Sequence, residues 1–114
     1  MDVVDRFIDA FNAGDFETMR SLMADGYSHA EPLYPGPYDA DEHTKLMREV
    51  LERTPDRRVA VVKRLAGVAA TVVELVWTGT MPGGDAMRID GIYVFDLAPE
   101  ADLILRSRAF YGAP

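Results

Sequence analysis

A glutamate at the end of a short predicted strand is the first residue whose type and position could do chemistry. Glu31 is followed directly by Pro32, and His29 stands two residues before it. On an extended strand, residues two apart share a face, so the His29 and Glu31 side chains should lie side by side. A carboxylate there could act as a general base, with the histidine as its partner. The alternative is a solvated strand end, where glutamates are usually found.

A second acidic residue, Asp90, lies in the middle of a predicted strand. Ile92 and Val94 share its face, and the opposite face is apolar too, so we expect Asp90 to be at least partly buried. A buried carboxyl finds a partner or stays protonated, and the protonated form can donate a hydrogen bond. The alternative is a structural acid that pairs with Arg88 or Arg108, or that faces water at an edge.

The first half of the chain has the apolar spacing of helices. Helices are predicted over 2–13, 16–23 and 41–53, with a short strand over 26–31 and a proline-rich loop over 33–38. Asp2 and Asp15 should cap the first two helices, and Gly14 should end the first. The second half is rich in β-branched and aromatic residues, which predicts strands over 57–65, 70–80, 86–97 and 102–111.

Helices followed by a strand meander indicate an α+β fold, with the helices on one face of the sheet. The 114 residues are enough for a single domain, 1–114. Apolar periodicity places five side chains in the core: Phe11, Leu22, Val61, Leu75 and Phe95.

Composition excludes several classes of function. The net charge of −7 and the absence of basic clusters argue against nucleic-acid binding. No apolar run could cross a bilayer, the start does not resemble a signal peptide, and cysteine is absent, so a cytoplasmic protein is expected. The two histidines lack metal-site spacing, and no glycine-rich phosphate loop occurs, so neither a metal nor another cofactor is expected.

Several segments together resemble the nuclear-transport-factor-2-like superfamily, closest to its ketosteroid isomerase and SnoaL-like (polyketide cyclase) branches. The run 7–15 is similar to the first helix and turn of that superfamily, and Glu31-Pro32 to the place of the isomerases' acidic base. Ile89-Asp90 resembles the strand that bears their second acid, and 108–112 resembles their closing strand.

This resemblance implies a cone-shaped, curved antiparallel sheet with about three N-terminal helices enclosing an apolar pocket, often in a homodimer. It implies Glu31 as the general base and a protonated Asp90 as the donor to an enolate. The isomerases have a tyrosine where Phe7 stands, and phenylalanine cannot donate. Tyr111, or after it Tyr34, would then replace that donor. The substrate-binding residues expected on this basis are Phe7, His29, Tyr34, Trp77, Ile92, Ala109 and Tyr111.

The leading hypothesis is a cofactor-independent enzyme that moves a proton at a carbon next to a carbonyl. Its substrate would be a small, largely apolar compound with a steroid- or polyketide-like ring system. One alternative is a non-catalytic module that binds a small ligand or forms a dimer. Another is a dehydratase, a cyclase or an epoxide hydrolase on the same fold.

Overall fold

The computed structural model describes residues 2–99 and 102–112 of the chain. In chain order the elements are α1 (Val3–Ala13), α2 (Phe16–Ser21), β1 (Met23–Ala30), α3 (Ala40–Arg53), β2 (Arg58–Ala66), β3 (Ala70–Thr80), β4 (Ala86–Leu97) and β5 (Ile104–Tyr111). This confirms the predicted α+β class, with three helices and a curved, unclosed sheet of five strands.

The first two helices begin after the predicted caps, and α1 ends at the predicted glycine. α2 ends at Ser21, earlier than predicted, because β1 begins at Met23. The Asp2 side chain accepts a hydrogen bond from the backbone N–H of Asp5, and that of Asp15 accepts one from Thr18. Gly14 ends α1 with a φ of 68°, a left-handed conformation that glycine adopts without steric cost.

The sheet has the strand order β1-β5-β4-β3-β2. Strands β2 to β5 form the predicted antiparallel meander. β1 adds to the other edge by parallel pairing with β5, which places His29 opposite Ser107. This pairing was not predicted, because it joins two segments that are far apart in the sequence.

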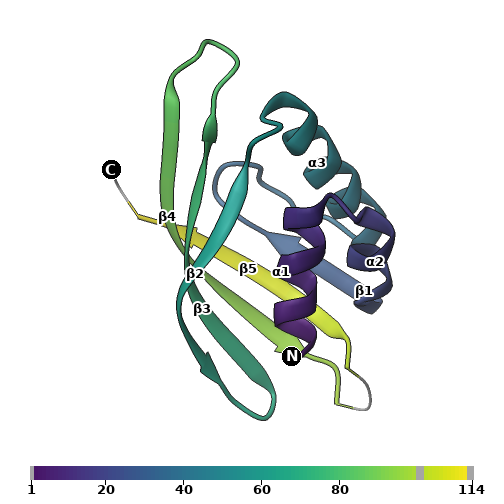
Figure 1. The fold of residues 1–114 in the computed structure, drawn as a ribbon. Helices are drawn as coiled ribbons and strands as arrows, with labels where there is room; N and C mark the ends of the chain where they lie inside the picture. The colour runs from purple at the N-terminus through teal and green to yellow at the C-terminus, as the bar shows by residue number, and fades with distance from the viewer. Residues whose placement is uncertain (1, 100–101, 113–114) are drawn as a thin grey trace.

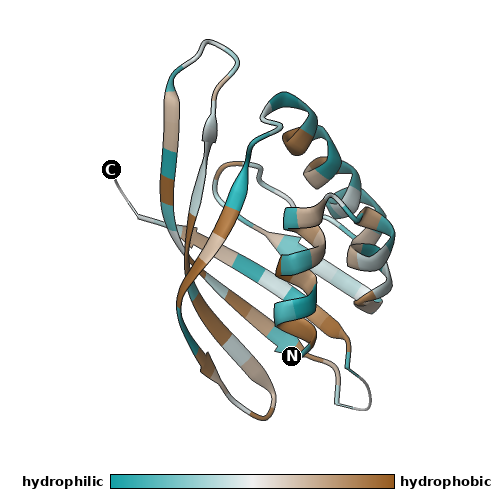
Figure 2. Ribbon diagram, viewed as in Figure 1, coloured by the Kyte–Doolittle hydropathy of each residue, from teal (hydrophilic) through white to brown (hydrophobic). Residues whose placement is uncertain are grey.

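All three helices cover one face of the sheet, and the β3–β4 hairpin projects beyond them at the upper left of Figure 1. Where β4 approaches the hairpin, hydrophobic and hydrophilic residues alternate in Figure 2, whereas residues 92–95 are hydrophobic or aromatic without interruption. The helices of the described residues lack the length and apolarity that a membrane span needs.

The core lies between the helices and this inner face of the sheet. Phe11, Leu22, Leu75 and Phe95 are buried there, as predicted. Val61 is the exception: it is 43% exposed, so its predicted burial is wrong. The pairing of β2 with β3 is irregular between Val61 and Lys63, and such a bulge breaks the simple alternation of inward and outward side chains.

Candidate active site

The inner face of β1 supplies three polar side chains in a row. Tyr27, His29 and Glu31 alternate with outward-facing residues and point into the molecule, with 3%, 0% and 8% of their surface exposed. Glu31 follows directly on β1 and continues its alternation. The expected shared face of His29 and Glu31 is therefore present, whereas the solvated strand end is not.

The Glu31 carboxylate accepts a hydrogen bond on each oxygen. His29 Nε2 lies 2.8 Å from Oε1, and the Tyr111 hydroxyl donates to Oε2 over 3.0 Å. Tyr111 thereby uses its one proton, so the Tyr93 hydroxyl, 2.8 Å away, must donate to Tyr111. Burial above all raises the pKa of both tyrosines, so both stay protonated donors at neutral pH.

A second line of hydrogen bonds runs from His29 deeper into the molecule. His29 Nδ1 lies 2.7 Å from Ser107 Oγ, which lies 2.6 Å from the Tyr27 hydroxyl. That hydroxyl is 2.7 Å from His43 Nδ1 on α3. Burial, reinforced by nearby His29, holds the pKa of His43 well below its usual range, so His43 is neutral.

The protons of this line can be arranged in one consistent direction. When His29 is neutral and donates through Nε2 to Glu31, its Nδ1 accepts from Ser107. Ser107 then accepts from Tyr27, whose hydroxyl accepts from His43. In this arrangement every O–H and N–H of the line points toward Glu31, so its carboxylate is the acceptor on which both lines end.

Glu31 also faces a pocket of about 210 Å³, here called the mouth pocket. The proline-rich loop and the β3–β4 hairpin form much of its wall. Its lining side chains are Glu31, Leu33, Tyr34, Met47, Arg57, Trp77, Met81, Met87, Ile89 and Tyr111. Glu31 is the one carboxylate among these, in a wall that is mostly apolar.

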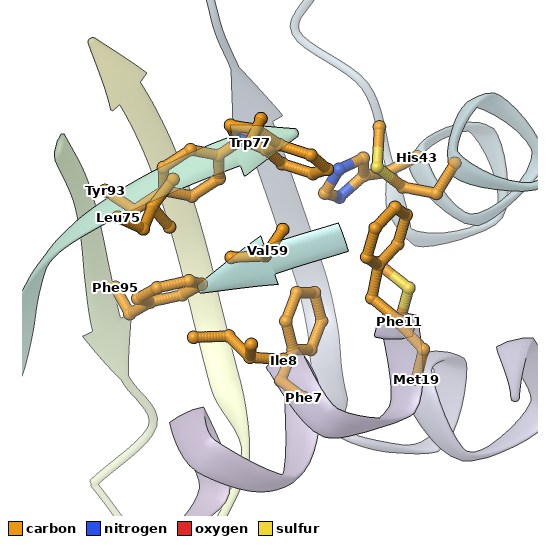
Figure 3. A pocket seen from close by; sticks show the side chains of 11 residues that line it. Phe7, Ile8, Phe11, Met19, His43, Val59, Leu75, Trp77, Tyr93 and Phe95 are labelled. Atoms are coloured by element: carbon orange, nitrogen blue, oxygen red, sulfur yellow. The ribbon is translucent and has the colours of Figure 1, made fainter. Parts of the chain in front are cut away.

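A smaller inner cavity of about 30 Å³ lies among α1, α3 and the sheet. Figure 3 shows Phe7, Ile8 and Phe11 of α1 converging with strand side chains and with His43. Met47 and Trp77 line both spaces. The apolar core thus continues into the wall of the mouth pocket.

The structure brings most of the predicted site residues together. Tyr34, Trp77 and Tyr111 line the mouth pocket with Glu31, and His29 lies directly behind the carboxylate. Phe7 instead lines the inner cavity, 5.8 Å from Phe95 between ring centres. Ala109 is 3% exposed on the inner side of β5 and lines neither space.

Asp90 is not in the pocket, so its expected burial beside Glu31 is wrong. Its side chain is 65% exposed on the outer face of the sheet and pairs with Arg88 at 3.3 Å. Ile92 is on the same outer face, 46% exposed, so its expected place in the pocket is wrong as well. Because both faces of β4 carry apolar residues, the pattern could not tell inside from outside. The alternative of an acid paired with Arg88 describes Asp90 correctly.

Three residues near Glu31 were not singled out from the sequence: Ser107, His43 and Arg57. Ser107 alternates with Ala109 on the buried face of β5, and His43 precedes Met47 by four positions on the buried face of α3. A polar residue at an apolar periodic position was the available signal in both cases. Within residues 2–99 and 102–112, no three His, Cys, Asp or Glu side chains gather as a metal ion would require.

A curved, open sheet with three helices on its concave side and a pocket at one end defines the nuclear-transport-factor-2-like fold. Within that superfamily, the model of the SnoaL-like domain matches residues 4–106. The chain therefore belongs to the SnoaL-like family. No curated protein matches it.

Solved structures share the fold at low sequence identity. A hypothetical protein with a ketosteroid isomerase-like fold from Catenulispora acidiphila has a TM-score of 0.85 at 11% identity, over 96% of this chain and 85% of its own. IdmH from Streptomyces antibioticus, described as a candidate polyketide cyclase, has 0.83 at 18%, over 96% and 88%. A SnoaL-like protein of unknown function from Burkholderia thailandensis has 0.76 at 23%, over 96% and 92%. At these identities the likeness shows the fold alone.

Proposed function

We propose that this protein is a cofactor-independent enzyme that moves a proton at a carbon next to a carbonyl in a ring-containing, largely apolar substrate. The observation that carries the proposal is the Glu31 carboxylate, which is 8% exposed and stands in a mostly apolar pocket wall. Polyketide- and steroid-like rings match this chemistry, and the description of IdmH as a candidate polyketide cyclase supports the same substrate class.

Glu31 is the proposed general base. A carboxylate has about four acceptor positions, and His29 and Tyr111 occupy two of them. One position on each oxygen is left for a substrate proton. The two hydrogen bonds also hold the carboxylate in a fixed orientation, which favours a base that must meet defined carbons of a bound ligand.

The carbonyl oxygen gains negative charge when the proton leaves, and it needs a donor in the same pocket. Asp90 faces away from the pocket, and the Tyr111 hydroxyl already donates its hydrogen bond to Glu31. Tyr34 accepts from Arg53 over 3.3 Å and keeps its own proton free. Tyr34 is therefore the proposed oxyanion donor, in place of the expected Tyr111.

The proposed step balances within substrate and enzyme. Glu31 takes the proton from the α-carbon, and the C–H electron pair forms a carbon–carbon double bond. The carbonyl π electrons move to oxygen, where Tyr34 donates a hydrogen bond. Protonated Glu31 then returns the proton to another carbon of the conjugated enolate, which regenerates the carbonyl and the carboxylate.

Hydrogen–deuterium exchange at the α-carbon of β,γ-unsaturated cyclic ketones tests this proposal. Glu31→Gln is nearly isosteric but cannot accept the proton, so exchange should fall by at least about 10²-fold at equal site occupancy. NMR follows the deuterium incorporation. A wild-type protein that exchanges no ketone of a panel faster than buffer contradicts the proposal.

Two matched variants serve as controls for the loss of a carboxylate. Glu17→Gln changes an exposed glutamate of α2, and Asp90→Asn changes the acid on the outer sheet face. Both should exchange at the wild-type rate. If Asp90→Asn instead loses activity as Glu31→Gln does, the outer face takes part in the reaction and the mouth pocket is the wrong site.

A further inference from the structure

Arg57 places a positive charge in the wall of the mouth pocket. It stands between α3 and β2 and is the one cationic side chain among the described residues that line this pocket. Its guanidinium is partly buried. That burial above all lowers the pKa of Arg57, although an arginine stays charged throughout the physiological range. An anionic partner stabilises a positive charge that is partly buried in this way.

The guanidinium is held in place by groups that leave much of its donor capacity unused. Its Nε donates to Thr54 Oγ1 over 3.1 Å, and Nη2 lies 3.4 Å from Met87 Sδ. Its central carbon lies 5.1 Å from the centre of the Trp77 ring, a cation–π contact. Since a guanidinium has five N–H donors, three have no protein acceptor among the described residues.

Carboxylates of the described residues do not neutralise Arg57. None of them comes within 4.0 Å of its nitrogens. The carboxylate of the preceding Asp56 accepts from the backbone N–H and the hydroxyl of Thr80 instead. Glu31 lines the same pocket but accepts from His29 and Tyr111.

The neighbouring Trp77 shows the same lack of an acceptor. Its indole is 5% exposed, and its Nε1–H is a buried donor with no partner among the described residues. An unpaired buried donor costs about 1–3 kcal/mol, so such groups are usually satisfied. Two adjacent side chains of the pocket wall thus both have N–H donors without an acceptor among the described residues.

We propose that Arg57 binds a carboxylate on the ligand, which makes the substrate class a ketone that also carries a carboxylate rather than a neutral ketone. The inference rests on the proposed use of the mouth pocket and adds a charged group to its substrate. A planar carboxylate can accept two parallel hydrogen bonds from a guanidinium. The ring system of the ligand would then extend along Trp77 and the methionines toward Glu31.

The test compares two probes of the same shape, 2-naphthoate and the neutral 2-naphthamide. Trp77 is the single tryptophan of the chain, so its indole N–H gives one NMR signal whose shift on titration reports binding at this site. Wild-type protein should bind naphthoate at least about 10-fold more tightly than naphthamide, because hydrogen bonds between ionised groups are stronger. Arg57→Gln should weaken naphthoate by at least about 10-fold and change naphthamide by less than about twofold.

Arg58→Gln is the matched control, since it removes the same charge one residue later from an exposed position. It should leave the preference for naphthoate intact. If Arg57→Gln does not fold, Arg57→Lys replaces it: the point charge should reduce the preference and leave naphthamide binding unchanged. Equal affinity of the wild type for both probes, equal weakening of both by the variants, or no binding of naphthoate at millimolar concentration overturns the inference.

The outcome is separable from that of the proposed reaction. A wild type that prefers naphthoate but exchanges no ketone proton contradicts the reaction alone. A wild type that exchanges ketone protons but does not prefer naphthoate contradicts the carboxylate subsite alone. Glu31→Gln should keep the preference for naphthoate, because it leaves Arg57 in place.

Discussion

Glu31 is surrounded by hydroxyl and imidazole side chains, each of which can donate one hydrogen bond. Tyr111 donates to one oxygen and is itself supported by Tyr93, while His29 reaches the other oxygen with Ser107 behind it. Such a network holds the carboxylate still and leaves about two of its four acceptor positions free for a ligand. The local sequence indicated the pairing of His29 with Glu31. It could not indicate Ser107, which reaches His29 only through long-range strand pairing.

His43 makes the stability of the fold depend on pH. Its pKa lies well below 6.5 in the folded protein, because burial and the neighbouring His29 disfavour the charged form. In the unfolded chain the pKa is close to 6.5. Below that pH the unfolded chain takes up a proton that the folded protein does not, so the free energy of unfolding falls as the pH falls, by up to about 1.4 kcal/mol per pH unit.

Urea unfolding between pH 7 and pH 5 measures this dependence. His43→Gln should flatten it, so that by pH 5 the wild type has lost about 2 kcal/mol more than the variant. The glutamine amide can still bond with Tyr27, and other titrating groups are common to both proteins. Parallel loss of stability in the two proteins would show that His43 is protonated as easily when folded as when unfolded.

At the scale of the elements, local sequence patterns predicted where most helices and strands lie, but not which distant strands pair. The bounds of β3 and β4 agree with the prediction, because turn residues flank runs of β-branched and aromatic residues. The edge position of β1 could not be predicted, since no local pattern encodes a parallel partner eighty residues away. The sequence did indicate that His29 and Glu31 share a face, because they are two residues apart, but not that this face is the buried one.

The pairing of β4 with β5 contains a glycine that positions Tyr111. Gly91 lies opposite Tyr111, and a Cβ added there would come within 2.9 Å of the tyrosine ring. Gly91→Ala should therefore push the ring away from Glu31 and destabilise the protein by about 1–3 kcal/mol through overpacking. Ketone proton exchange should fall to the level of Tyr111→Phe, and the double variant should lose little more.

Gly83→Ala in the β3–β4 turn is the control, because a Cβ there meets nothing within 4 Å. It should change neither exchange nor the free energy of unfolding by a measurable amount. Full exchange activity in Gly91→Ala would mean that the Tyr111 ring adapts and that its approach over the glycine is unimportant.

At the scale of the whole molecule, the two faces of the sheet differ in use. The inner face carries the core and the proposed site, whereas the outer face has no element packed on it within the described residues. Ile92 and Phe110 are paired across β4 and β5 on that face and are 46% and 57% exposed. Charges of both signs surround them, with Asp96 paired to Arg106 and Arg108.

The homodimer expected from the family resemblance stays a prediction, and this outer face is where we expect it to form. Two copies related by a twofold axis would cover both apolar pairs and could place acidic groups of one copy against basic groups of the other. Phe110→Glu puts a charge at the centre of such an interface, so it should convert the dimer to a monomer. Light scattering coupled to size-exclusion chromatography should then give the chain mass of 12.7 kDa, and twice that for the wild type.

Val68→Glu is the matched control for the added charge. Val68 is fully exposed in the β2–β3 turn, so the same change there should leave the dimer intact.

Since Phe110 alternates with the inward-facing Ala109 and Tyr111, Phe110→Glu should also keep the fold and the mouth pocket. Its exchange activity per chain should stay within about twofold of the wild type, as expected for a surface substitution away from the site. A wild-type protein that is monomeric at about 100 μM, well above the dissociation constant of a stable dimer, would contradict the expected assembly. A dimer that Phe110→Glu does not disturb would instead place the interface on another surface.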